Sequence, residues 1–160
     1  DATPSAPPSV NEPLICYNVD KDLESVPCYD DVLAAAGHGA FVLSENPTRY
    51  VAFSRDWLHN EMKTNSKNLA VIRAMGDSMA PLICPGDFLL MDQSRKDVRE
   101  GVFVFRLEDT LYVKKLQRTP GHKLKAISHN PDYPAFEINL TDAPDFEIIG
   151  KVIWLGKRIL

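Results

Sequence analysis

The second half of the chain alternates short apolar runs with turn-forming residues. Runs rich in β-branched and aromatic residues span 69–75, 87–91, 102–107, 111–117, 123–128, 135–140 and 146–155. Their length and spacing predict antiparallel strands. Glu108-Asp109-Thr110 and Pro120-Gly121-His122 lie between neighbouring runs and predict two hairpin turns. With no repeat, heptad pattern or long amphipathic helix in the sequence, we predict a mainly β fold with short helical turns.

The first half is less regular. Phe41-Val42-Leu43, Val26–Tyr29 and Tyr50–Phe53 each predict a short extended piece. Ser54 precedes Arg55-Asp56-Trp57-Leu58, which predicts a helical turn capped by the serine, with its apolar residues directed inward.

The N-terminal segment differs in composition from the rest of the chain. Asp1–Pro13 is rich in proline, serine and alanine, which favours extended conformations over a packed core. We therefore expect a linker or flexible segment over residues 1–25 and one folded domain over residues 26–160. A linker at the start also predicts a further domain upstream of it.

Composition narrows the function classes. The 160 residues are 44% hydrophobic and 25% charged, which suits one domain with a real core. A net charge of −4 and a pI of about 5.5 argue against direct nucleic-acid binding by this chain. Its three cysteines (Cys16, Cys28 and Cys84) lack CxxC spacing, which disfavours a disulfide framework and a zinc site. Without an apolar run of ~20 residues or a signal core, we expect a cytoplasmic protein with no membrane partner.

One stretch has the features of a nucleophile-bearing turn. The apolar run Leu69–Met75 leads directly into Gly76-Asp77-Ser78-Met79-Ala80-Pro81. Glycine allows a sharp change of direction there, so Ser78 is expected at an exposed strand-to-turn junction, close to backbone N–H groups. A serine nucleophile and an ordinary turn serine would both suit this position, so the interpretation depends on a partner for Ser78.

Histidine is not the expected partner. The four histidines (His38, His59, His122 and His129) lie in loop-like contexts, and no spacing relates one of them to Ser78. We therefore expect surface histidines and neither a Ser-His-Asp triad nor a metal site. Cys84 is expected to be a packed small side chain.

A neutral lysine can also activate a serine. Burial in apolar surroundings can lower a lysine pKa by up to about 3–5 units. Lys114 and Lys115 lie in the strand-like run Leu111–Leu116, where adjacent side chains point to opposite faces. The alternation leaves open which lysine points inward, and also whether both are solvated.

The motifs together resemble the self-cleaving domain of LexA and lambda-type phage repressors, a serine peptidase group that also includes UmuD. The resemblance rests on Gly76–Pro81, on Pro85-Gly86-Asp87 and on Tyr112-Val113-Lys114-Lys115-Leu116. Three further segments extend it: Ala36-Gly37 resembles the scissile bond, residues 128–134 the Asn-Pro-Tyr loop, and residues 148–154 the closing strand. The first lysine of the Val-Lys-Lys-Leu motif matches the general base of the family, which selects Lys114.

The resemblance implies a LexA/signal-peptidase-like β fold and a slow, intramolecular serine peptidase without metal or cofactor. Ser78 would be the nucleophile and Lys114 the general base. The backbone N–H groups of Asp77 and Ser78 would form the oxyanion hole, and the Ala36–Gly37 bond would be cleaved. From local physics alone, the alanines before Gly37 equally predict a helix that ends at that glycine.

The resemblance also implies partners. We expect a homodimer, and a RecA filament or an antirepressor protein as the trigger of cleavage. The apolar content of residues 148–160 exceeds what one sheet face requires, so we expect the dimer surface there. DNA would be bound only through a helix-turn-helix upstream of this chain. Two alternatives remain open: a UmuD-like mutagenesis accessory protein, and a non-catalytic dimerisation or effector module in which Ser78 is only a turn residue.

Overall fold

The computed structural model describes residues 19–30 and 46–159. The strands are β1 (Leu23–Tyr29), β2 (Arg49–Ser54), β3 (Leu69–Arg73), β4 (Phe88–Asp92), β5 (Glu100–Leu107), β6 (Thr110–Thr119), β7 (Lys123–Ile127), β8 (Phe136–Asn139) and β9 (Glu147–Gly156). The helical elements are α1 (Val19–Asp22), the π-helical turn η1 (Trp57–Glu61) and the 3₁₀ turn η2 (Ser66–Asn68).

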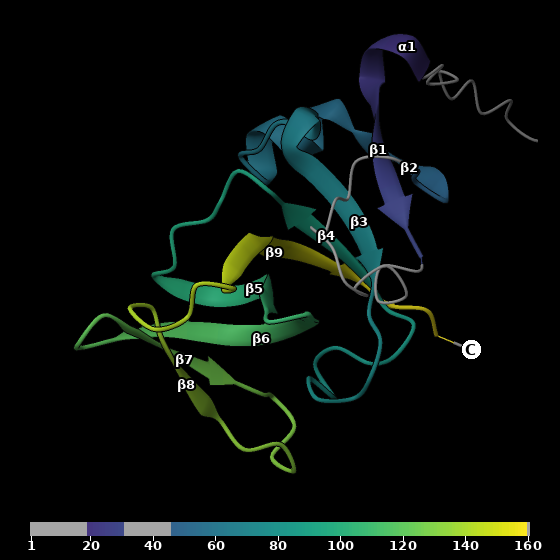
Figure 1. Ribbon diagram of the computed structural model, residues 1–160. Helices are drawn as coiled ribbons and strands as arrows, with labels where there is room; N and C mark the ends of the chain where they lie inside the picture. The colour runs from purple at the N-terminus through teal and green to yellow at the C-terminus, as the bar shows by residue number, and fades with distance from the viewer. Residues whose placement is uncertain (1–18, 31–45, 160) are drawn as a thin grey trace, which may run out of the picture.

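These strands form one sheet in the order β2-β1-β3-β4-β9-β5-β6-β7-β8. Figure 1 shows the sheet strongly twisted, with β1 and β3 running steeply across the view and β5 and β6 crossing it almost level. The mainly β fold is confirmed, and the seven apolar runs of the second half correspond to β3–β9. Both predicted hairpins are present, as the antiparallel pairs β5–β6 and β6–β7.

The sheet is mixed. The pairs among the second-half strands β3–β9 are antiparallel, as predicted, but a strand of the first half adds a parallel pair. β1 pairs in parallel with β3, with Cys28 opposite Val71. All other neighbouring strands of the described sheet are antiparallel. A parallel pair needs a crossover between its two strands. Here β2, η1 and η2 lie between them, and a strand pattern does not reveal which strand will be the neighbour.

In the first half, α1 and the start of β1 lie within residues 1–25, which we expected to be a linker or flexible segment. The predicted pieces at 26–29 and 50–53 lie within β1 and β2, whereas the piece at 41–43 lies outside the described residues. Ser54 Oγ accepts a hydrogen bond from the Trp57 backbone N–H (3.4 Å), and Leu58 is fully buried. The helical turn continues to Glu61, beyond Leu58, the last residue of the predicted turn.

Both faces of β3 and β4 are buried, because the twisted sheet has apolar clusters on either side of them. Alternate residues of these strands enter two different clusters. The first cluster comprises Ala70, Ile72, Ala74, Met79, Ile83, Leu89, Met91, Val104 and Ile149. The second comprises Val98, Phe103, Phe105, Leu116, Leu124, Ala126 and Ile138. The third comprises Val26, Cys28, Leu58, Leu69, Val71 and Leu90.

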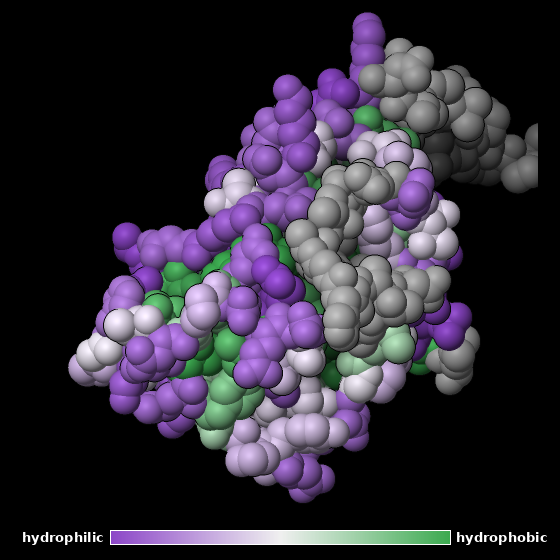
Figure 2. Space-filling view, viewed as in Figure 1, coloured by the Kyte–Doolittle hydropathy of each residue, from purple (hydrophilic) through white to green (hydrophobic). Residues whose placement is uncertain are grey.

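In Figure 2, hydrophilic residues cover most of the rim of one face and apolar residues show mainly towards its middle.

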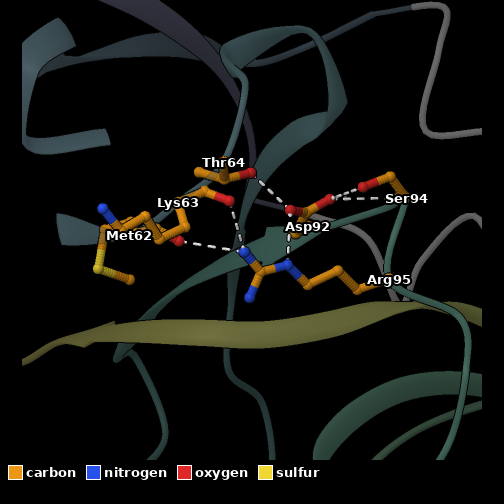
Figure 3. A network of polar contacts seen from close by, with 6 residues as sticks. All are labelled: Met62, Lys63, Thr64, Asp92, Ser94 and Arg95. Carbon is orange, nitrogen blue, oxygen red and sulfur yellow. Dashed lines mark hydrogen bonds and ion pairs between the residues drawn. The ribbon is translucent and has the colours of Figure 1, made fainter. Parts of the chain in front are cut away.

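A buried carboxylate at the end of β4 holds the segment that follows η1. Asp92 is 2% exposed. It accepts hydrogen bonds from Thr64 Oγ1 (2.5 Å), from Ser94 Oγ (2.6 Å) and from the Ser94 backbone N–H (2.9 Å). Arg95 Nε lies 3.2 Å from the same carboxylate (Figure 3).

Arg95 continues this network into the chain after η1. Its guanidinium donates to the backbone carbonyls of Met62 (3.1 Å) and Lys63 (2.8 Å). Burial raises the pKa of Asp92, but the donors from Ser94 and Thr64 and the charge of Arg95 outweigh burial and hold the pKa below its ordinary value of 3.8. Folding therefore stabilises the ionised carboxylate.

We expect Asp92→Ala to destabilise the fold by about 3–5 kcal/mol, because it leaves buried donors and the Arg95 charge without their acceptor. Urea unfolding at pH 7 measures this change. Since the pKa of Asp92 is lowered by folding, its contribution is present above about pH 4 and is lost as the pH falls through the folded-state pKa.

The matched control is Asp97→Ala, which removes a carboxylate that is 69% exposed and paired with Arg99. It should shift the urea midpoint far less. Equal shifts for the two variants would contradict the structural role assigned to Asp92.

Candidate functional site

The turn that contains Ser78 is closed at its base by backbone hydrogen bonds. β3 ends at Arg73, and the Ala74 N–H then donates to the Asp87 carbonyl (2.8 Å), while the Gly86 N–H donates to the Ala74 carbonyl (2.9 Å). Gly76 has a φ of +73°, a left-handed conformation that favours glycine. Ser78 lies on the loop so formed, where it is half-buried and so less exposed than we expected.

Two anchors fix this loop to the rest of the domain. Met79 and Ile83 are buried in the first cluster. Asp87 accepts a hydrogen bond from the Cys84 backbone N–H (2.8 Å) and an ion pair from Lys157 Nζ (2.8 Å), just beyond β9. Burial raises the pKa of Asp87, but the hydrogen bonds from Lys157 and Cys84 and the charge of Lys157 lower it by more. The pKa of Asp87 therefore lies below its ordinary value.

Lys114 is the inward-facing lysine of β6. It lies opposite Phe103 of β5, a member of the second cluster, and is 5% exposed. Lys115 points to the other face, where it is exposed and pairs with Glu100 at 2.9 Å. The alternative that both lysines are solvated is therefore wrong.

Burial changes the acid–base behaviour of Lys114. Desolvation lowers its pKa from the ordinary value of 10.5, because the apolar surroundings disfavour the ammonium form. Lys114 Nζ donates a hydrogen bond to Ser128 Oγ (2.7 Å) and lies 5.3 Å from the centre of the Tyr133 ring. A lysine with a lowered pKa is neutral more often near neutral pH, which a general base requires.

Ser78 and Lys114 line the same pocket, although they come from the turn after β3 and from β6. Its cavity volume is about 90 Å³. Most of the other side chains that line it are apolar: Ile72, Ala74, Met75, Met79, Ile83, Leu111 and Val113. The pocket therefore combines a serine hydroxyl and a buried amine with walls suited to small apolar groups.

The loop at 128–134 joins the Ser78 turn to the Lys114 strand. The Asn130 N–H donates to the Ser78 carbonyl (3.0 Å), and Asn130 Nδ2 donates to the Asp77 carbonyl (3.1 Å). Tyr133 OH donates to Asp77 Oδ1 (2.5 Å), and this hydrogen bond and the carboxylate charge raise the pKa of Tyr133. Both sides of the pocket are thus held by one loop.

Sequence reasoning matched this loop to a motif but missed the roles of Ser128 and Tyr133. Neither residue has a distinctive spacing relative to Ser78 or Lys114, and only the tertiary structure brings them to the Lys114 amine. Within the described residues, no hydrogen bond starts from the backbone N–H of Asp77 or of Ser78, so both donors are available to a further acceptor.

The described histidines lie at the surface, as expected. His59, His122 and His129 are exposed, whereas His38 lies outside the described residues. Cys84 is half-buried, with its Sγ 3.6 Å from the Pro81 carbonyl. The bond between Ala36 and Gly37 also lies outside the described residues, so its position relative to Ser78 stays a prediction.

Two other kinds of feature are absent from residues 19–30 and 46–159. This part of the chain has no group of three or more His, Cys, Asp or Glu side chains placed to hold a metal ion. Of its helices, none is long and apolar enough to cross a membrane.

Comparison with known proteins gives consistent matches to repressors. Repressor protein CI of Enterobacteria phage phi80 is 33% identical over 138 residues, which are 84% of this chain and 56% of the phage protein. The 26 kDa repressor protein of Escherichia phage HK022 is 31% identical over 77% of this chain and 54% of its own length. The LexA repressor of Bifidobacterium adolescentis is 31% identical over 62% of this chain and 37% of its own length.

This chain therefore spans about half the length of the phage repressors that it matches. A family profile, Peptidase S24-like, matches residues 27–153, which include the Ser78 turn, β6 and the 128–134 loop. Because this match covers most of the sequence, the chain belongs to the Peptidase S24-like family.

Proposed function

We propose that this chain is the self-cleaving and dimerising part of a LexA-like or phage-type transcriptional repressor. Ser78 is the nucleophile, Lys114 is the general base, and the Ala36–Gly37 bond is the substrate. The observation that supports this most directly is the shared pocket of Ser78 and a buried Lys114 with a lowered pKa. A solvated lysine would remain an ammonium at neutral pH and would not accept a proton.

The reaction follows from these groups. Neutral Lys114 accepts the hydroxyl proton as Ser78 Oγ attacks the carbonyl carbon of Ala36. The negative oxygen of the tetrahedral intermediate accepts hydrogen bonds from the backbone N–H groups of Asp77 and Ser78, each of which contributes about 3 kcal/mol in comparable sites. The C–N bond breaks, Lys114 protonates the Gly37 amine, and a water molecule later hydrolyses the Ser78 ester.

The composition of the proposed substrate suits the pocket. Val32-Leu33-Ala34-Ala35-Ala36-Gly37 has small and apolar side chains, and the pocket walls are mostly apolar. Since the segment belongs to the same chain, its effective concentration at Ser78 is high without a separate binding step. Control would then come from how often the segment occupies the pocket.

The repressor relatives extend the proposal to partners. A helix-turn-helix domain upstream of residues 1–25 would bind DNA, and dimerisation through this chain would pair two such domains on a two-fold operator. Cleavage between the two parts would separate DNA binding from dimerisation and relieve repression. A RecA filament formed on DNA damage, or an antirepressor protein, would favour the conformer in which the segment occupies the pocket.

Self-cleavage under alkaline conditions tests the chemistry. We expect the purified chain at pH 9–10 to produce two fragments whose intact masses correspond to cleavage between Ala36 and Gly37, because a larger fraction of Lys114 is then neutral. Ser78→Ala should abolish the products, and Lys114→Ala should slow their formation roughly 100-fold or more.

Lys115→Ala is the matched control, since it removes the neighbouring lysine from the exposed face of the same strand. It should cleave at the wild-type rate. A chain that stays intact throughout would favour the non-catalytic dimerisation or effector module, and cleavage that persists in Ser78→Ala would exclude Ser78 as the nucleophile.

The pH dependence of the rate is a further test. Because burial lowers the pKa of Lys114, the neutral base is fully formed at a lower pH than a solvated lysine would require. The cleavage rate should therefore rise with pH and level off below pH 10.5. A rate that keeps rising in proportion to hydroxide concentration through that pH would contradict a lysine base.

A further inference from the structure

We propose that Ser128 is a positioning residue for Lys114: its hydroxyl accepts one N–H of the lysine amine and so directs the nitrogen lone pair towards Ser78. This inference rests on the proposed function, because it assigns Ser128 a part in the same self-cleavage. Ser128 would act through the base, because its hydroxyl contacts Lys114 Nζ.

The local geometry favours this role. Lys114 Nζ and Ser128 Oγ are 2.7 Å apart, a distance typical of a strong hydrogen bond. A neutral lysine amine has two N–H bonds and one lone pair, and it rotates freely about its last carbon–nitrogen bond when nothing holds it. If one N–H is directed at Ser128, this rotation is restricted and the lone pair is confined to fewer directions.

The sheet fixes where Ser128 lies relative to Lys114. β7 pairs with β6 so that Ile127 is opposite Lys115, and Ser128 is the next residue after β7 ends. The position of its hydroxyl is thus set by strand register and not by a free loop. Ser128 is half-buried, which limits competition from solvent for this hydrogen bond.

The same loop also contacts the nucleophile. Two residues beyond Ser128, the Asn130 N–H donates to the Ser78 carbonyl at 3.0 Å. A short segment therefore has one hydrogen bond to the proposed base and another to the proposed nucleophile. Ser128 and Asn130 together keep the lysine amine and the serine in a defined relation.

Other groups around Lys114 do not provide this orientation. The titratable side chains that share its pocket or contact it are Arg73, Tyr112 and Tyr133. The neighbouring elements also contain Glu100 and Arg106 (β5), Lys115 and Arg118 (β6), Lys123 and Lys125 (β7), His129 and Asp132 (the loop) and Lys151 (β9). Tyr133 presents its ring face to Nζ, and its hydroxyl donates to Asp77. In the described part of the chain, Ser128 Oγ is the hydrogen-bond acceptor of Lys114 Nζ.

Removing the hydroxyl should therefore have two opposite effects. Ser128 stabilises the ammonium form more than the neutral amine, because a charged donor makes the stronger hydrogen bond. Ser128→Ala should then lower the pKa of Lys114 further and move the rise of the cleavage rate to lower pH. The rate on the alkaline plateau should nevertheless fall, roughly 10-fold, because the amine is no longer oriented.

Cleavage rates of the whole chain measured from pH 6 to 11 test both effects. Ser128→Thr keeps the hydroxyl and should restore the wild-type midpoint and most of the plateau rate. Ser66→Ala is the matched control, since it removes another part-buried serine hydroxyl, one that bonds Glu24 Oε2 at 3.0 Å. It should change neither quantity. An unchanged profile for Ser128→Ala, or a lower plateau without a shift in midpoint that Thr fails to rescue, would overturn the inference.

A second measurement does not depend on cleavage. NMR titration of the Lys114 side chain in the Ser78→Ala background reports its pKa directly, with and without Ser128→Ala. A lower pKa in the double variant supports the hydrogen bond, and an equal pKa contradicts it. A Ser78-containing chain that never cleaves, together with a responsive Lys114, would overturn the proposed function and the catalytic part of this inference while leaving the hydrogen bond in place.

Discussion

The proposed chemistry depends on the desolvation of one lysine. A lysine in water is an ammonium at neutral pH, and only a loss of solvation brings the neutral amine within reach. In this fold Lys114 loses its solvation because it is buried on β6 opposite Phe103 of β5, which is fully buried. Ser128 gives the amine a hydrogen-bond partner that carries no charge. A carboxylate in the same place would stabilise the ammonium form and raise the pKa of Lys114.

A second requirement is that two loops far apart in sequence keep a fixed relation. The turn that contains Ser78 and the loop at 128–134 are joined by hydrogen bonds from Asn130 and Tyr133 to the backbone and side chain of the turn. Figure 1 shows these loops leaving the sheet on the same side, below β3 and beyond β7. The strand order makes this possible, because it brings β3, β6 and β7 into one sheet although long stretches of chain separate them.

β4 has a buried carboxylate at each of its ends. Asp87 precedes the strand and is 6% exposed, and Asp92 is its last residue. Both have lowered pKa values, since nearby donors outweigh the effect of burial. Asp87 holds the Ser78 turn against the chain after β9, and Asp92 holds the segment after η1 (Figure 3). Asp87 and Asp92 therefore anchor the irregular segments at both ends of β4. Replacing either ionised side chain should destabilise the fold, because it leaves buried donors without their acceptor.

The alternation of apolar and polar residues was enough to predict β3–β9, the two hairpins and the turn at Gly76, because these depend on neighbours close in sequence. The same pattern left open which of Lys114 and Lys115 is buried, since a period of two defines two faces of a strand but not which face will be covered. The parallel pairing of β1 with β3 and the contact of Ser128 with Lys114 were decided only by tertiary structure. Both depend on strand order and register, which relate residues across the sheet and leave no local trace in the sequence.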